Sequence, residues 1–250
     1  ATEVAESIDR NSLEEALASG VCEPVDFDRP LPSATFYEGI DVQPGHIAAG
    51  LPAPRPTLTG QVAAAIDRGE CVLVTGPSGA GKSTVMWTAA YTTRHVLWYR
   101  IRRLRNEDTP ALVRLARALK PTTRSPIGFV VDGIGIGAAE SWDVLHRELA
   151  PIPGVMLLGS VRSEDLLPLR SRASCTQITV TLDEEVAEQI HAGLSASGTT
   201  KALHWREAFE ASDGLTLEFT HLLTRGRRLS DVLAEQVDRR VLERRQTEIE

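Results

Sequence analysis

The sequence predicts an α/β fold, in which a parallel sheet carries helices on both faces and is followed by a small all-helical domain. Two observations lead to this prediction. From Cys71 to Val180, short apolar runs rich in β-branched residues alternate with helical patterns, which is typical of a three-layer α/β/α domain. From Leu182 onward the strand pattern stops and helical periodicity continues alone.

Each expected strand is a short, mostly apolar run, as a buried parallel strand requires. The expected strands cover residues 71–75, 95–101, 127–132, 155–160 and 175–180. Helices are expected over residues 81–93, 110–120 and 142–150, the last with Ser141 as its N-cap. In the helical part, Thr181 and Glu184 fit a capping box, and further helices are expected over 201–211, over 214–224 and from Leu229.

The composition is that of an ordinary globular chain. Its 250 residues are 42% hydrophobic and 24% charged, enough for one α/β domain and a smaller appendage. The net charge of −7 argues against a nucleic-acid partner. No apolar run approaches the roughly 18 residues that span a bilayer, and no signal peptide is present, so we expect a cytoplasmic location and no membrane partner. Cys22, Cys71 and Cys175 are far apart in the sequence, show no metal-ligand spacing and are expected to be free thiols.

Proline and glycine set the N-terminal segment apart. Residues 1–57 hold a short helical start at 11–18 and then a Pro/Gly-rich stretch, which predicts an extended arm. The chain begins at Ala1 and ends within a helical pattern that has no stop signal. We therefore expect a piece of a longer polypeptide, whose last helix leads toward further domains.

One motif defines the expected chemistry. Residues 76–83, "GPSGAGKS", match G-x-x-x-x-G-K-[ST] in full, after an apolar strand and at the start of a helix. In such a P-loop, glycines let successive N–H groups surround phosphate, and the helix N-terminus adds its positive dipole end. We expect the loop to bind a nucleoside triphosphate through Gly76, Pro77, Ser78, Gly79, Ala80, Gly81, Lys82, Ser83 and Thr84.

Within this P-loop the polar side chains have separate roles. Lys82 is expected to reach the β- and γ-phosphates, Ser83 to ligate Mg²⁺, and Thr84 to cap the α-phosphate region. The alternative is a glycine-rich turn with an exposed lysine. On the P-loop interpretation, residues 58–181 form a nucleotide-binding domain and residues 182–250 a helical lid.

Asp132 ends the apolar run "GFVV" and is the expected Walker B carboxylate. Such a residue lies at a strand end near the P-loop and holds the water shell of Mg²⁺. The alternative is a solvated aspartate in a turn, since Asp-Gly is a common turn dipeptide. The next residue is Gly133 rather than an acid, which leaves no obvious general base and predicts slow hydrolysis.

The strand "VMLLGSVR" ends in polar residues. In a sheet of this kind that end faces the γ-phosphate, so Ser160 and Arg162 are candidates for sensing it. The alternative for Arg162 is an ordinary surface arginine, because most basic residues of this chain are arginines.

These motifs, in this order, resemble the additional-strand P-loop ATPases, and with the helical part they resemble the STAND and NB-ARC-like signal-transducing ATPases. The pair "VTLDEEVAEQI" and "SDGLTLEFTHLL" is similar to that family's helix entry and its later G-L-P-L motif. The resemblance implies that Gly214 and Thr216 contact the nucleotide, with Thr216 standing where the family usually has proline. It also implies a lid that closes over ADP, ATP-driven homo-oligomerisation, an AAA-like hydrolase activity, and adenine as the base.

Other functions remain open at this stage. The chain is also compatible with a small-molecule or nucleotide kinase, with a nucleotide-binding module that lacks hydrolysis, or with a nucleic-acid motor. The segment "WYRIRRLR" holds Arg100, Arg102, Arg103 and Arg105, which are compatible with solvated charges, a nucleic-acid patch or an oligomer arginine finger.

Overall fold

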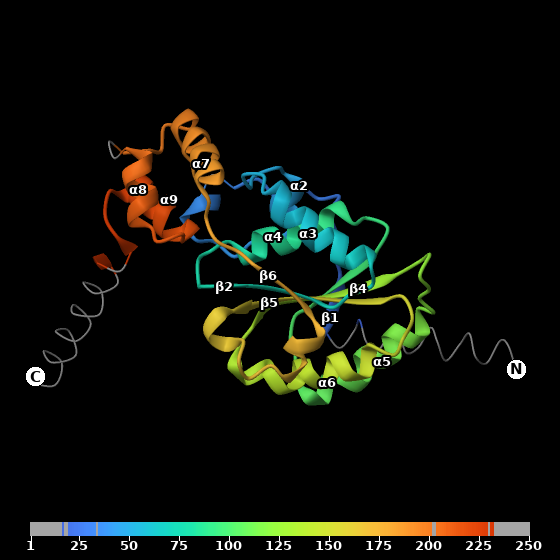
Figure 1. The fold of residues 1–250 in the computed structure, drawn as a ribbon. Coiled ribbons are helices and arrows are strands. Elements are labelled where there is room, and N and C mark those ends of the chain that lie inside the picture. The colour runs from blue at the N-terminus through green and yellow to red at the C-terminus, as the bar shows by residue number, and fades with distance from the viewer. Residues whose placement is uncertain (1–16, 18–19, 34, 202–203, 230, 233–250) are drawn as a thin grey trace, which may run out of the picture. The chain divides into compact units, whose positions relative to one another are not determined.

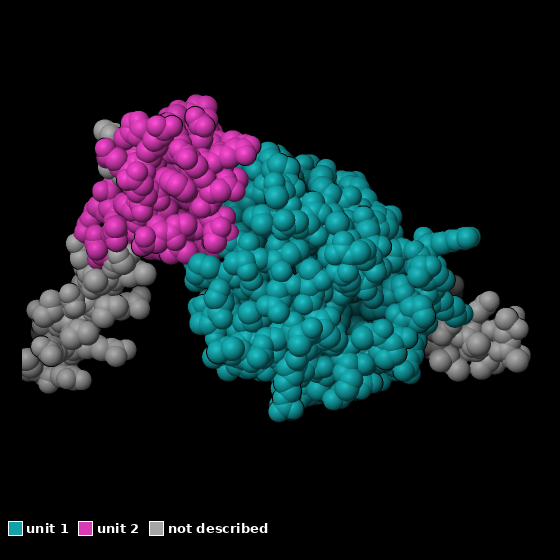
Figure 2. Space-filling model, in the orientation of Figure 1, with its two compact units in different colours: residues 1–34, 41–78, 82–180 teal, residues 35–40, 79–81, 181–250 magenta. Residues whose placement is uncertain are grey.

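The fold described here is that of a computed structural model, in which residues 17, 20–33, 35–201, 204–229 and 231–232 are described (Figure 1). The described chain divides into two compact units (Figure 2). Unit 1 comprises residues 1–34, 41–78 and 82–180, and unit 2 comprises residues 35–40, 79–81 and 181–250.

Unit 1 is built on one sheet of six strands in the order β1-β3-β4-β5-β2-β6. The strands are β1 (Cys22–Pro24), β2 (Val72–Gly76), β3 (Leu97–Ile101), β4 (Ile127–Ile134), β5 (Val155–Arg162) and β6 (Thr176–Thr179). Strands β2 to β6 pair in parallel, and the short β1 pairs antiparallel with β3 at one edge. The five predicted strands are all present, with β5 lying between β2 and β4.

Helices cover both faces of this sheet, so the α/β three-layer prediction is confirmed (Figure 1). One face carries α2 (Pro44–Ala48), α3 (Pro56–Asp67) and α4 (Lys82–Thr92), and the other carries α5 (Thr109–Ala118) and α6 (Ala139–Leu149). Short 3-10 turns lie in the connections: η2 (Asn106–Asp108), η3 (Ile136–Ala138), η4 (Ser163–Asp165) and η5 (Arg170–Ser174).

One large part of the core of unit 1 lies between the sheet and helices α5 and α6. Phe129 on β4 and Trp142 on α6 are both fully buried there. A Cβ atom added to Gly159 on β5 would stand 2.6 Å from the Ile134 side chain and 2.9 Å from the Trp142 ring. Helix α6 packs this closely because β5 has no side chain at that position.

Two local predictions need correction. Ser141 is not the N-cap of α6, because the helix begins at Ala139 and Ser141 is buried within its first turn. The arm over residues 1–57 is not purely extended, because it contributes β1, α2, the start of α3 and the 3-10 turn η1 (Phe36–Glu38). Most of the helical start predicted at 11–18 falls outside the described residues.

Unit 2 contains α7 (Glu184–Ala196), α8 (Trp205–Ala211) and α9 (Thr216–Arg225), together with η1. Asp183, rather than Thr181, caps α7, and its carboxylate accepts a hydrogen bond from the Val186 N–H at 2.8 Å. Helix α8 begins at Trp205, later than the predicted 201. Most of the helix predicted from Leu229 lies outside the described residues.

Among the residues described, no helix combines the length and the apolar character that crossing a membrane requires.

Candidate functional site

The P-loop connects the end of β2 to the start of α4, where the sequence places it. Gly79 and Gly81 have φ values of 79° and 94°, a conformation that residues with side chains rarely adopt. Ala80 between them is fully buried. The glycines of the motif are thus required by the backbone path of the loop.

Lys82 is the first residue of α4, and its ammonium group turns back over the loop. Its Nζ atom donates a hydrogen bond to the Pro77 carbonyl oxygen at 2.7 Å. Burial lowers the pKa of Lys82, and repulsion by Arg162 lowers it further, while Glu164 and Asp132 act in the opposite direction. A group held in this way gains more from an added negative charge than an exposed lysine would.

Asp132 lies near the end of β4 and is joined to the P-loop helix. The Ser83 hydroxyl on α4 donates to Asp132 Oδ1 at 2.8 Å. The hydroxyl of Ser160, on the neighbouring strand β5, donates to the same oxygen at 2.6 Å. Ser83 and Asp132 are 49 positions apart in the sequence, and both are predicted to hold the same Mg²⁺ ion. The structure brings their side chains together.

Ser160 lies beside Asp132, and its expected sensing of the γ-phosphate stays a prediction. Its side chain is 1% exposed, and its hydroxyl also accepts a hydrogen bond from the Gly133 N–H at 2.8 Å. It therefore holds Asp132 and the following peptide in position. Sequence reasoning missed this contact because it depends on β5 lying beside β4, which no local pattern in the sequence reveals.

Gly133 follows Asp132 with a φ of 78°, in the left-handed region. A Cβ atom there would meet no neighbouring atom within 4 Å, so the constraint is on backbone conformation and not on space. An acid at this position would be strained. The absence of a carboxylate after Asp132 thus has a physical cause in the turn itself.

Arg162 is the last residue of β5, and it pairs in register with Gly76, the first residue of the P-loop. Its side chain is exposed, and its charge acts on Lys82. The sheet thus places Arg162 and Lys82 at the same edge, where parallel strands end. Two cations at one strand edge form a site for a multiply charged anion.

The remaining predicted binding residues lie in the loop, the first turn of α4 and unit 2. Pro77 and Ser78 lie between Gly76 and Gly79 of the loop, and Thr84 follows Ser83 in α4. Within unit 2, the Thr216 hydroxyl donates to the Ala80 carbonyl oxygen at 2.9 Å. Gly214 has a φ of 77°, and its carbonyl oxygen accepts from the Leu182 N–H at 2.8 Å.

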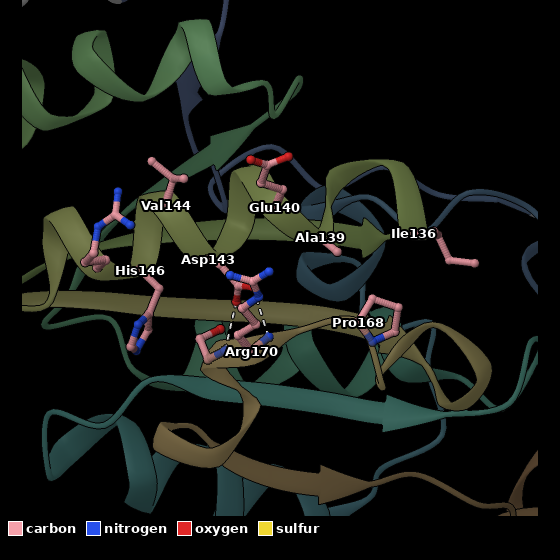
Figure 3. A pocket seen from close by; sticks show the side chains of 10 residues that line it. Ile136, Ala139, Glu140, Asp143, Val144, His146, Pro168 and Arg170 are labelled. Carbon is pink, nitrogen blue, oxygen red and sulfur yellow. Dashed lines mark hydrogen bonds between the residues drawn. The ribbon is translucent and has the colours of Figure 1, made fainter.

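A separate cavity of about 620 Å³ lies along α6 and the segment that follows η4 (Figure 3). Among its lining residues are Asp143, His146 and Arg170. Asp143 accepts hydrogen bonds from the Arg170 N–H at 2.9 Å and the Ser171 N–H at 2.8 Å. None of the predicted nucleotide-binding residues lines this cavity.

The arginines of the segment 100–105 each form an ion pair with an acidic side chain of unit 1. The pairs are Arg100–Asp41 at 3.7 Å, Arg102–Glu23 at 2.6 Å, Arg103–Asp108 at 3.0 Å and Arg105–Glu107 at 3.2 Å. Arg100 also lies over the Trp87 ring, 5.7 Å from its centroid. Their charges are balanced locally, which favours the interpretation as structural and solvated charges.

The position of β5 decides the fold family. It is an additional strand inserted between the P-loop strand β2 and the strand β4 that carries Asp132. The chain has the fold of an additional-strand P-loop NTPase. In this fold, Lys82 and Ser83 follow β2, Asp132 lies near the end of β4, and Arg162 ends the additional strand itself.

No protein-family model matches the sequence, and no curated protein matches it significantly. Among solved structures, this chain is similar to a STAND protein with a tetratricopeptide repeat sensor from Pyrococcus horikoshii, with 13% identity and a TM-score of 0.45. That match covers 64% of this chain and 28% of the other, so the chain spans well under half of that protein.

Two further similarities cover more of the other chain. The AAA domain of FIGL-1 in complex with ADP shows 18% identity and a TM-score of 0.44, over 84% of this chain and 77% of that one. A Walker-type ATPase of Pyrococcus abyssi shows 14% identity and a TM-score of 0.46, over 78% and 76%. The fold assignment above rests on the strand order and the P-loop.

Proposed function

We propose that this P-loop NTPase binds ATP, hydrolyses it slowly, and acts as a conformational switch within a larger multidomain signalling or defence protein. The observation that carries the proposal is the hydrogen bond of Ser83 to Asp132 at 2.8 Å. This hydrogen bond joins the P-loop helix to the carboxylate near the end of β4. Nucleotide hydrolysis requires these two parts of the site to lie side by side.

The same pair suits a magnesium ion. A serine hydroxyl and a carboxylate are the hard oxygen donors that Mg²⁺ prefers, and Ser83 and Asp132 present them at adjacent points. Ser83 would hold the ion directly, and Asp132 would hold it or its waters. When bound, the ion neutralises charge on the phosphate oxygens.

The chain's own side chains would complete the site. Lys82 would exchange its bond to the Pro77 carbonyl for the β- and γ-phosphates, which offer full negative charge. Arg162 would pair with the γ-phosphate from the end of β5. Ser160 would act as a positioning residue, because its hydroxyl bonds both Asp132 and the Gly133 N–H.

Slow turnover follows from the residue after Asp132. Gly133 offers no side chain to orient a water molecule, and its left-handed backbone disfavours replacement by an acid. A long-lived ATP state suits a switch, because the state must outlast the signal it conveys. Nucleotide binding without hydrolysis is the second candidate, and the same feature of Gly133 favours it.

The switch would lie in how the helical unit responds to the nucleotide. Thr216 and Leu217, at the start of α9, bond the backbone of Ala80 and Gly79, so α9 is tied to the part of the loop that would face phosphate. A γ-phosphate that alters this loop would therefore alter α9. We also propose that the protein forms a homo-oligomer when ATP is bound and retains ADP after hydrolysis. It would contact further domains of the same polypeptide. A kinase has less support, because α7 to α9 follow β6 instead of interrupting the sheet.

The test is a turnover assay on purified protein with Mg²⁺ and ATP, with and without common phosphate acceptors. We expect phosphate release well below about 1 s⁻¹, no transfer to an acceptor, and no activity in Lys82→Ala. Lys201→Ala is the matched control, since Lys201 is an exposed lysine outside the loop. Brisk acceptor-dependent transfer would contradict the switch and favour the kinase.

A further inference from the structure

Three potential metal ligands meet at the end of the sheet opposite the P-loop. Cys71 immediately precedes β2, Cys175 immediately precedes β6, and His146 lies near the C-terminal end of α6. One ligand atom from each lies within 4.8 Å of the other two. Among the described residues these three form the only such group.

The sequence did not suggest this cluster, because Cys71 and Cys175 are 104 residues apart. They are brought together because β2 and β6 are parallel neighbours, with the Thr176 N–H donating to the Cys71 carbonyl at 2.8 Å. The two sulfurs lie 2.7 Å apart and both are free thiols. The cysteines show no metal-ligand spacing along the sequence, because the pairing of β2 with β6 is what brings them together.

We propose that Cys71, Cys175 and His146 bind a thiophilic divalent cation of the zinc class, with water as the fourth ligand. Two thiolates and one imidazole form a ligand set that zinc accepts. Zinc sites with three protein ligands and a water molecule in the fourth position are well established. The ion would cross-link the starts of β2 and β6 to helix α6.

The distances suit a small ion. Zinc–sulfur bonds of about 2.3 Å at a tetrahedral angle separate two sulfurs by about 3.8 Å, and sulfur from nitrogen by about 3.6 Å. The three ligand atoms lie within 4.8 Å of one another, which is compatible with both separations. The sulfurs at 2.7 Å need to separate by about 1.1 Å, which rotations of about 20° about both Cα–Cβ bonds together supply.

Charge and burial support the same ligand. Cys175 is 8% exposed and belongs to the hydrophobic core, where an unpaired charge would be costly. Zn²⁺ displaces one proton from each of the two thiols, and the 2+ ion with two thiolates and neutral His146 carries no net charge. The complex can therefore be buried without a counter-ion.

Access comes from the side of α6. His146 also lines the cavity of about 620 Å³ along that helix, as Figure 3 shows with its side chain drawn among the lining residues. The cavity therefore gives an ion and its water a route to His146, one of the three ligands. Because the cluster lies at the start of β2 and the P-loop at its end, the metal would stabilise unit 1 without touching the nucleotide.

The test is a titration of the reduced, metal-free protein with Co²⁺ as an optical probe, followed by Zn²⁺ competition. We expect one equivalent of Co²⁺, with sulfur-to-cobalt charge-transfer absorption and the visible bands of a tetrahedral ion, displaced by Zn²⁺. Zn²⁺ should also raise the melting temperature. Removing a ligand should weaken binding by about 100-fold or more, because even outer-shell partners are worth 10- to 100-fold.

The variants are Cys175→Ser and His146→Ala, with Cys22→Ser as the matched thiol control. Burial raises the pKa of the Cys22 thiol to about 11, and Cys22 lies outside the cluster. His146→Ala removes a half-buried side chain from a helix, so it decides the question if Cys175→Ser fails to fold. Equal Co²⁺ binding by wild type and His146→Ala would overturn the proposal. So would a Cys71–Cys175 disulfide, seen as a mass 2 Da lower, in protein that binds no Co²⁺ once reduced.

Discussion

At the scale of single residues, the site depends on one carboxylate oxygen that accepts two hydroxyl hydrogen bonds. Asp132 Oδ1 is bonded by Ser83 from the P-loop helix and by Ser160 from the additional strand. The P-loop could be found from the sequence because its geometry is local to one turn and one helix start. The Ser160 contact could not, because it depends on which strand lies beside β4.

Replacing Asp132 by asparagine tests its proposed charge-dependent role. The amide keeps the size of the carboxylate but loses the negative charge that would hold Mg²⁺ and its waters. We expect Mg²⁺-dependent turnover to fall by about 100-fold, which corresponds to about 3 kcal/mol. Steady-state phosphate release measured across Mg²⁺ concentrations checks this. Unchanged turnover and Mg²⁺ dependence would contradict the role given to Asp132.

Ser160→Ala tests the positioning role. The variant removes one hydrogen bond to Asp132 and leaves the Gly133 N–H without this acceptor, which should lower the free energy of unfolding by about 1 to 3 kcal/mol. The Mg²⁺ concentration at half-maximal turnover should rise, while nucleotide affinity without Mg²⁺ should stay the same. A purely structural role would lower stability and leave the Mg²⁺ dependence unchanged.

At the scale of elements, apolar runs predicted the parallel strands, but edges and caps escaped prediction. Strand β1 has only three residues and exists through pairing with β3, a contact between distant segments. Helix α3 is not among the predicted helices, and only its first two residues fall in the predicted arm; Pro56 stands at its first position, where proline is tolerated. Local signals fix an element's type more reliably than its ends.

Gly159 should be required for the packing of α6 on β5. In Gly159→Ala the new methyl group would stand 2.6 Å from the Ile134 side chain and 2.9 Å from Trp142. We expect a loss of about 1 to 3 kcal/mol in unfolding free energy, measured by chemical denaturation. The matched control is Gly137→Ala, where an added Cβ meets no atom within 4 Å. Equal stability of the two variants would contradict this packing.

Asp143 anchors η5 through the N–H groups of Arg170 and Ser171. Burial raises the pKa of this carboxyl, but hydrogen bonds from Ser171 and Arg170 outweigh it and hold the pKa below its usual range. A lowered folded-state pKa means that the ionised form stabilises the fold, and that this stability is lost as pH falls through the lowered value.

The corresponding variant is Asp143→Asn. At pH 7 it should lose about 1 kcal/mol of unfolding free energy, a modest figure because the carboxylate is partly exposed to solvent. The difference from wild type should shrink as pH falls into the acid range, in denaturation curves recorded at several pH values. A difference that is constant with pH would show that the charge of Asp143 makes no contribution.

At the scale of the whole molecule, strand order converts separate motifs into one site. The ends of β2, β4 and β5 place Lys82, Asp132 and Arg162 at one edge of the sheet. The starts of β2 and β6 place two cysteines at the other edge. The alternation of strands and helices predicted the first arrangement, because parallel strands end on one side. The sequence could not predict that the two cysteines meet, because this depends on which strands are neighbours in the sheet.

Nucleotide binding through the P-loop is the property on which all the other proposed functions of this chain depend. The most direct measurement is calorimetric titration of the nucleotide-free protein with a non-hydrolysable ATP analogue and Mg²⁺, beside Lys82→Ala and the exposed-lysine control Lys201→Ala. We expect one nucleotide-binding site per chain in the wild type and in Lys201→Ala. In Lys82→Ala, nucleotide affinity should be at least about 100-fold weaker. No binding by the wild type, or equal binding by Lys82→Ala, would contradict it.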